Sequence, residues 1–166
     1  MNYYNCGAEK VSLKDLIKKA LNTLYEKDWE LLCLGKDERI NKHVGERAIV
    51  FRFGIYFQQE LNKIPELKDL NLDCEYNRKG TNPKSITIKN RIMPDIILHQ
   101  RGNNNHNLLV LEFKGWWNKN QEYDKKKIEK LIDNAGEYGY KEGYTILLDK
   151  RYSDDNIQQV FVDKQL

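Results

Sequence analysis

The feature that most constrains this chain is a run of four apolar residues that passes directly into charged ones. Leu108-Leu109-Val110-Leu111 is typical of a strand buried on both faces at the centre of a sheet, yet Glu112 and Lys114 follow it at once. Because side chains alternate along a strand, Glu112 and Lys114 share one face, and Phe113 points to the other. A carboxylate and an ammonium at the end of a buried strand are costly unless they are paired or bind something.

A second acid stands at the start of the preceding apolar segment. Asp95 follows Pro94 and opens the strand expected over residues 94–99. If the two strands are neighbours, they bring Asp95 close to Glu112 and Lys114. Two close carboxylates need a cation between them, and Mg²⁺ commonly takes one or two carboxylates together with water and phosphate oxygens. Singly, each of these acids is an ordinary turn or surface residue, and only their combination indicates a metal site.

The remaining pattern predicts an α/β fold with a mixed sheet flanked by helices. Ser12 is placed to cap a helix whose apolar residues repeat from Leu13 to Leu24, and a second helix is expected from about Asp37 to Asn62, before Pro65. Strands are expected over residues 71–76, 85–89, 94–99, 108–114, 144–148 and 160–162, the first two forming one hairpin, with a helix over Ile128, Leu131, Ile132 and Ala135. We expect one domain over residues 1–166, helical to about residue 65 and sheet-containing from about residue 70.

Composition excludes several classes of protein. The chain has 166 residues, 40% of them hydrophobic, and its apolar clusters recur throughout, which excludes a disordered chain. No run approaches the roughly 18 apolar residues of a membrane span, so no membrane partner is expected. The three cysteines form no Cys-x-x-Cys pair, so neither a zinc ribbon nor a disulfide framework is expected. The first residues lack the layout of a signal peptide, and a cytoplasmic location is therefore expected.

Basic residues are concentrated in the second part of the chain. The net charge of +3 divides into −1 for residues 1–76 and +4 for residues 77–166. Clusters of this kind can contact the phosphates of a nucleic acid, although they can equally form a solvated face. The candidates for nucleic-acid binding are Arg78, Lys79, Lys127 and Lys130.

Pro94-Asp95, a spacer of sixteen residues with a Gly/Asn turn, and Glu112-Phe113-Lys114 together form a specific pattern. In this pattern the chain resembles the PD-(D/E)XK nuclease superfamily, including its short bacterial members. The resemblance implies a restriction-endonuclease-like core. It also implies that Asp95, Glu112 and the backbone carbonyl of Phe113 ligate Mg²⁺, with Mn²⁺ as a substitute, and that Lys114 is the catalytic lysine.

Three further residues are candidates for the site, either because of the same resemblance or because of their position in the sequence. Nucleases of this type often have a glutamate on a helix ahead of the sheet, and Glu46 matches it on the same helical stripe as Val50 and Phe53. Its alternative role is that of a first-turn acid favoured by the helix dipole. Glu75 and His99 could support the metal ligands or a second metal, and for Glu75 exposure at the edge of the sheet is the alternative.

The resemblance implies a Mg²⁺-dependent nuclease that hydrolyses phosphodiester bonds, with DNA as the expected substrate; RNA or a nucleotide stays open. Because 166 residues leave no room for a separate recognition module, a homodimer or a partner protein would supply sequence specificity. The alternative is a catalytically silent module of the same fold that acts through protein or nucleic-acid binding.

Overall fold

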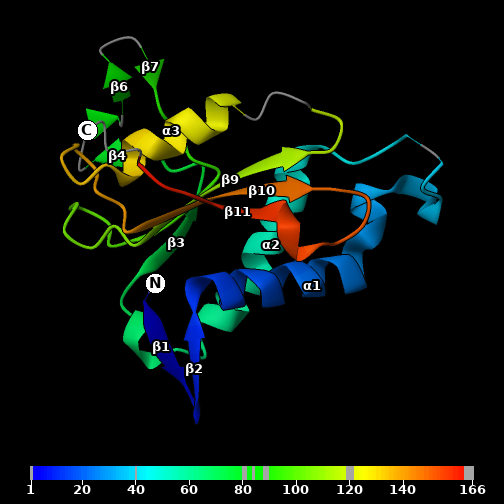
Figure 1. Cartoon of the computed structure of the whole chain (residues 1–166), viewed down its shortest axis with the longest axis horizontal. Coiled ribbons are helices and arrows are strands. Elements are labelled where there is room, and N and C mark those ends of the chain that lie inside the picture. The colour runs from blue at the N-terminus through cyan, green and yellow to red at the C-terminus, as the bar shows by residue number, and fades with distance from the viewer. Residues whose placement is uncertain are drawn as a thin grey trace. The chain divides into compact units, whose positions relative to one another are not determined.

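The structure is a computed structural model that describes residues 2–39, 41–79, 82–83, 85–87, 90–118 and 122–162 (Figure 1). The chain divides into two compact units, one formed by Met1–Asp69 with Leu148–Asn156 and the other by Leu70–Leu147 with Ile157–Leu166. The division at Leu70 falls where the sequence changes from helical to strand patterns. In the described part of the chain, no helix is long and apolar enough to cross a membrane.

The first unit begins with a hairpin that the residue pattern does not predict. β1 (Tyr3–Cys6) pairs antiparallel with β2 (Glu9–Ser12), and Cys6 lies opposite Glu9. The connecting turn uses Gly7 at a φ of 62°, a left-handed conformation that glycine adopts at little steric cost. Each strand has only four residues, and only two of the eight side chains are buried, so the sequence shows no clear alternation of apolar and polar residues here.

Helix α1 (Leu13–Leu32) confirms the predicted start at Ser12. Ser12 and Asp15 form a capping box: the Asp15 backbone N–H donates to Ser12 Oγ at 3.2 Å, and the Ser12 backbone N–H donates to the Asp15 carboxylate at 2.9 Å. These bonds satisfy two donors that the first turn of a helix would otherwise leave unpaired. The apolar stripe of the helix is buried, as predicted, at Leu13, Leu16, Ile17, Ala20, Leu21 and Leu24.

Helix α2 (Glu46–Leu61) begins nine residues later than predicted, so the expected start near Asp37 is wrong. A 3₁₀ turn, η1 (Leu34–Lys36), ends at Asp37, whose φ of −125° and ψ of 110° are extended. Gly45 then precedes α2 with a ψ of 139°, which is also non-helical. The apolar period exists only in the second part of the predicted segment, where the buried residues are Ile49, Val50, Phe53, Phe57 and Leu61.

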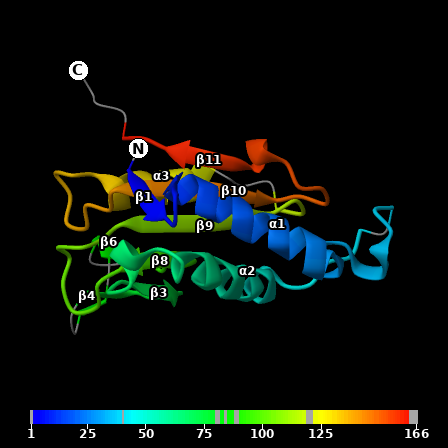
Figure 2. The same cartoon turned by 90° about the horizontal axis from the view of Figure 1, so that it is seen from below.

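A polar contact joins α1 to α2, which lie side by side in Figure 2. The Tyr56 hydroxyl donates to the Asp28 carboxylate at 2.5 Å, and Arg52 Nε donates to the same oxygen at 3.0 Å. Asp28 has a non-helical φ of −128°, which kinks α1 at this point. After α2, a 3₁₀ turn, η2 (Pro65–Leu67), starts with proline at its first position, where the missing N–H costs nothing.

Residues 148–156, which come just before the last strand of the chain, belong to the first unit and contact α1. The Tyr25 hydroxyl donates to the carbonyl of Asp149, and Trp29 Nε1 donates to the carbonyl of Lys150, both at 2.7 Å. A short 3₁₀ turn, η3 (Asp154–Asn156), follows. Its Asp154 forms an ion pair with Lys18, in which Oδ2 lies 2.6 Å from Nζ.

The second unit contains a five-stranded sheet in the order β11-β10-β9-β8-β3, which is visible from top to bottom in Figure 2. The strands are β3 (Asn71–Cys74), β8 (Ile96–His99), β9 (Leu109–Gly115), β10 (Glu142–Leu148) and β11 (Ile157–Val160). Three neighbouring pairs are antiparallel. β9 and β10 are also neighbours, but they run in the same direction. Their first residues lie side by side, since the Glu142 N–H donates to the Leu108 carbonyl at 3.0 Å. The predicted α/β fold with a mixed sheet is thus confirmed.

Helix α3 (Glu122–Ile132) crosses from β9 to β10 and covers one face of this sheet. Its apolar side joins a core cluster with Ile97 of β8 and Val110 of β9, to which it contributes Ile128, Leu131 and Ile132. Ile97 and Val110 are register partners, so they point to the same face. Ala135, which was expected in this helix, lies beyond its end.

The chain forms two smaller strand pairs in the segment that connects β3 to β8. β4 (Arg78–Lys79) pairs with β5 (Asn82–Pro83), and β6 (Ser85–Thr87) pairs with β7 (Asn90–Arg91). The prediction that residues 71–76 and 85–89 form one hairpin is wrong for the described residues, because β3 pairs with β8 and β6 pairs with β7; residues 88–89 lie outside the described part of the chain. The expected last strand is also displaced: β11 ends at Val160, and Phe161 and Val162, which follow it, are exposed.

Candidate functional site

The three residues of the predicted motif stand at the ends of two neighbouring strands. Asp95 immediately precedes β8, and Glu112 and Lys114 lie in the last part of β9. The antiparallel register pairs Ile96 with Leu111, which brings Asp95 beside Glu112. Asp95 Oδ2 accepts a hydrogen bond from the backbone N–H of Phe113 at 2.7 Å. The expectation that adjacent strands bring the two carboxylates together is therefore fulfilled by the sheet.

Glu112 is the most deeply buried acid at this strand end, with a relative exposure of 2%. Its Oε2 is 2.5 Å from Lys127 Nζ, and its Oε1 has no hydrogen-bond partner among the described residues. Burial raises the pKa of the Glu112 carboxyl well above its ordinary value, and the negative charge of Asp95 raises it further, while Lys127 opposes both effects. A second cation near Glu112 would favour its charged form.

Lys114 pairs with an acid that the sequence analysis did not single out. Its Nζ is 2.8 Å from Asp124 Oδ2, and the two side chains are only 18% and 10% exposed. Asp124 lies in the first turn of α3, where an acid is also favoured by the helix dipole. A signal for it exists in the sequence: Asp124 stands four residues before Ile128, on the apolar stripe of the helix, where an acid needs a partner.

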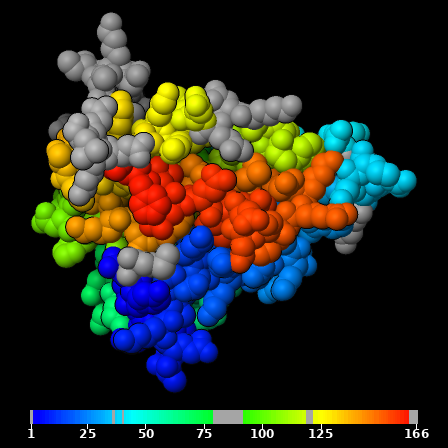
Figure 3. All heavy atoms as spheres, viewed as in Figure 1, coloured from blue at the N-terminus to red at the C-terminus, as the bar shows by residue number. Residues whose placement is uncertain are grey.

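Lys127 was predicted as a phosphate contact, but the structure turns it toward the sheet. Its side chain is 12% exposed and pairs with Glu112. Lys130, in the last turn of α3, is exposed, as is Arg78 in β4. Part of α3 is visible at the surface in Figure 3, in yellow. The side chain of Lys79 lies outside the described residues.

Glu46 and Glu75 both lie outside the strand pair β8–β9. Glu46 is the first residue of α2 and belongs to the first unit, so its role stays a prediction. Glu75 follows the end of β3 and has a φ of 50°. Its side chain is exposed, which agrees with the alternative of an exposed residue at the edge of the sheet. Its backbone N–H nevertheless donates to the Asp95 carbonyl at 3.1 Å, so it supports the main chain at the start of β8.

His99 belongs to a separate buried cluster at the other end of β8. Its Nε2 is 2.9 Å from Asp73 Oδ2, and its ring centroid is 4.8 Å from that of Tyr76. Arg101 also binds Asp73, through Nε at 2.8 Å and through a second guanidinium nitrogen. Arg101 and His99 lower the pKa of the Asp73 carboxyl, against the effect of burial. These contacts explain why a histidine stands in a buried strand.

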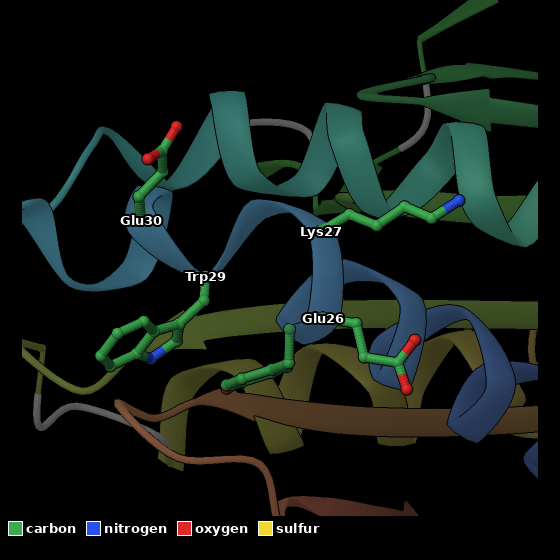
Figure 4. A pocket seen from close by; sticks show the side chains of 5 residues that line it. Glu26, Lys27, Trp29 and Glu30 are labelled. Atoms are coloured by element: carbon green, nitrogen blue, oxygen red, sulfur yellow. The ribbon is translucent and has the colours of Figure 1, made fainter. Parts of the chain in front are cut away.

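A concave surface of the first unit contains none of the predicted site residues. It has a volume of about 280 Å³ and is lined by Tyr25, Glu26, Lys27, Trp29 and Glu30, all from α1 (Figure 4). Their side chains spread around the helix at the kink, with Glu30 and Lys27 pointing away from the ring of Trp29. Tyr25 and Trp29 both donate to backbone carbonyls, so their polar groups already have partners within the first unit.

The donor set at the end of β9 fits a divalent cation of the Mg²⁺ type. Among the residues with a described position, no group of three or more His, Cys, Asp or Glu side chains could hold a metal ion by itself. Mg²⁺ does not require one, because it commonly takes one or two carboxylates and completes its shell with water and phosphate oxygens. The buried Oε1 of Glu112, which has no hydrogen-bond partner among the described residues, is the atom that such a cation would satisfy.

Comparisons with protein-family models, curated proteins and solved structures found no match to this chain. Function is therefore inferred from the geometry at the ends of β8 and β9.

Proposed function

We propose that this protein is a metal-dependent nuclease of the PD-(D/E)XK type, with a restriction-endonuclease-like core, that hydrolyses phosphodiester bonds in DNA. One observation carries the proposal: Asp95 binds the Phe113 N–H beside Glu112, which is buried and has a carboxylate oxygen without a partner among the described residues. A pair of adjacent carboxylates with an unsatisfied oxygen is what a divalent cation binds.

The residues of the site would divide the chemistry among them. Asp95, Glu112 and the backbone carbonyl of Phe113 would hold Mg²⁺ or Mn²⁺. When bound, the cation would lower the pKa of a water molecule and offset the charge that develops on the phosphate. Lys114 would hold that water against the scissile phosphate, and Asp124, 2.8 Å from its Nζ, would fix the position of the ammonium.

The substrate would be held mainly through its backbone phosphates. Arg78 and Lys130 are exposed, and the chain carries an excess of basic residues after residue 77. Such contacts give affinity without reading the sequence, so a second copy of the chain or a partner protein would supply specificity. We expect the protein to act in the cytoplasm.

The test is cleavage of supercoiled plasmid DNA by the purified full chain. With Mg²⁺ or Mn²⁺ we expect nicked and linear products, and with a chelator none. Asp95→Asn, Glu112→Gln and Lys114→Met should each reduce the rate by at least about a hundredfold, because metal ligands and positioned catalytic groups contribute at least that much.

Lys126→Met is the matched control, because Lys126 is an exposed lysine on the same helix and lies outside the site. This variant should cleave at a rate close to that of the unchanged protein. Circular dichroism of each variant separates loss of the site from loss of the fold. Cleavage that survives all three site substitutions would show that the proposed site is wrong.

A second candidate function is a catalytically silent module of the same fold that binds protein or nucleic acid. The observation that favours it is the internal neutralisation of the site, in which Glu112 pairs with Lys127 and Asp124 pairs with Lys114. A silent module would bind neither Mg²⁺ nor Mn²⁺ in calorimetry, and Asp95→Asn would leave its partner binding unchanged.

A further inference from the structure

Lys127 already contacts one of the two carboxylates that we propose as metal ligands. Its Nζ is 2.5 Å from Glu112 Oε2 and 3.4 Å from the carbonyl oxygen of Met93, two residues before Asp95. The ammonium is therefore close both to the last part of β9 and to the segment that leads into β8. Asp95 and Glu112 stand at these same two positions.

The ion pair with Lys127 uses only one of the two carboxylate oxygens of Glu112, so the carboxylate can still bind a second cation. Glu112 is 2% exposed, one of its oxygens faces Lys127, and the other has no partner in the described part of the chain. Asp95 lies beside Glu112, so this strand end holds two carboxylates. A divalent cation and an ammonium that bind the same carboxylate would repel each other strongly in a partly buried site. The two cations therefore compete for Glu112.

We propose that Lys127 is an internal counterion that a divalent cation displaces from Glu112, and that the released ammonium then binds a phosphate of the substrate. This inference rests on the proposed function and deepens it. The lysine side chain is long, flexible and charged, so it can exchange one anionic partner for another without movement of α3. Metal binding would then increase the affinity for nucleic acid, and nucleic acid would increase the affinity for metal to the same degree.

Two simpler roles for Lys127 make different predictions. If the ion pair only fastens α3 to β9, removal of the lysine loosens the site and weakens both metal and nucleic-acid binding. If Lys127 is only a phosphate contact, its removal leaves metal affinity without nucleic acid unchanged. If Lys127 instead competes with the metal for Glu112, the variant without the lysine binds metal more tightly, and neither of the simpler roles predicts this result.

The experiment is calorimetric titration of the full chain with Ca²⁺, and separately with Mn²⁺, in the absence of nucleic acid. Lys127→Gln is the main variant, because its amide still offers an N–H donor to Glu112, and Lys127→Met is the second. Lys126→Gln, from the exposed side of the same helix, is the control. We expect Lys127→Gln to bind the cation at least about tenfold more tightly than the unchanged protein, since a nearby positive charge is lost.

A second measurement follows the affinity for a short DNA duplex with and without Ca²⁺. In the unchanged protein Ca²⁺ should strengthen DNA binding, and in Lys127→Gln this gain should shrink by about threefold or more. Lys126→Gln should keep the gain. Circular dichroism and thermal melting establish that each variant is folded.

The outcomes separate this inference from the nuclease proposal. Equal or weaker cation binding by folded Lys127→Gln overturns the counterion role, and absence of cation binding in all variants overturns both proposals. Tighter cation binding by Lys127→Gln, together with no DNA cleavage by the unchanged protein in Mg²⁺, supports the counterion role and removes the nuclease. Cation binding by Lys127→Gln but not by the unchanged protein supports the counterion role in its strongest form.

Discussion

The Asp95 carboxylate accepts a hydrogen bond from the backbone N–H of Phe113 at 2.7 Å, so one acidic side chain fastens the start of β8 to the end of β9. A charge-assisted bond of this kind is stronger than one between neutral groups. The same carboxylate is a proposed metal ligand. Asp95 therefore has a structural role and a proposed chemical role, and substitutions of different kinds can separate them.

Asp95→Asn should remove the chemical role and keep most of the structural one. The amide oxygen can still accept from the Phe113 N–H, so we expect a loss of stability of less than about 1 kcal/mol. Asp95→Ala removes the acceptor and should cost about 1–3 kcal/mol. Urea denaturation measures both free energies of unfolding, and calorimetry with Mn²⁺ measures the loss of metal affinity that both variants should share. Equal stabilities of the two variants would contradict the structural role.

Asp124→Asn should reduce DNA cleavage by about tenfold or more through its effect on Lys114. The Lys114 ammonium would lose the carboxylate that lies 2.8 Å from it, whereas the proposed metal ligands would be untouched. A kinetic double-mutant cycle measures this: in the Lys114→Met background, Asp124→Asn should have almost no further effect. Glu122→Gln is the control, because Glu122 is an exposed acid in the same first turn. Additive losses in the cycle would show that Asp124 acts independently of Lys114.

The parts of the fold that depend on local chemistry are those that the sequence predicts well. The capping box at Ser12 and the apolar run of β9 are short-range patterns, and the structure contains both. The start of α2 was missed because residues 37–45 include no strong helix breaker before Gly45, although their backbone is extended at Asp37. The hairpin β1–β2 was missed because its strands are short and only two of their eight side chains are buried, which leaves no hydrophobic period.

Contacts between distant residues could not be predicted in the same way. The position of Asp95 beside Glu112 followed from an assumption that two strands are neighbours, and the register of β8 and β9 supplies the detail. The pairing of Asp124 with Lys114 could not be predicted even from neighbouring strands, because it depends on how α3 crosses the sheet. Lys127 belongs to a run of three lysines, and only the rotation of α3 directs this one toward Glu112 and leaves Lys126 outside.

Gly143→Ala should destabilise the second unit, because α3 packs directly on this position of β10. A Cβ atom at residue 143 would overlap the Cγ2 methyl of Ile128 and lie 2.9 Å from that of Ile132. Overpacking of this kind costs about 1–3 kcal/mol. Urea denaturation gives the free energy of unfolding, with Gly45→Ala as the control, since a Cβ there meets no atom within 4 Å. A stability equal to that of the control variant would contradict the close contact of α3 with β10.

Asp73→Asn should lower stability at neutral pH and have a diminishing effect in acid. Arg101 first, and then His99, hold the pKa of the Asp73 carboxyl below its ordinary value by hydrogen bonding. A depressed folded pKa contributes stability above the unfolded pKa of about 3.9, and this contribution is lost as the pH falls through the folded pKa. At pH 7 we expect a difference of about 1–2 kcal/mol from the unchanged protein, reduced because the Arg101 side chain is 58% exposed.

The measurement for Asp73 is urea denaturation of both proteins at a series of pH values from neutral to about pH 3, on either side of the ordinary carboxyl pKa. The difference in free energy of unfolding should be largest near neutral pH and narrow below about pH 4 as the native carboxylate of the unchanged protein gains a proton. Asp155→Asn, at an exposed acid outside this cluster, is the control and should give a small difference at every pH. A difference that stays constant into acid would mean that Asp73 stabilises the fold through packing alone. In that case the charge of Asp73 would have no part in holding His99 and Arg101 at the end of β8.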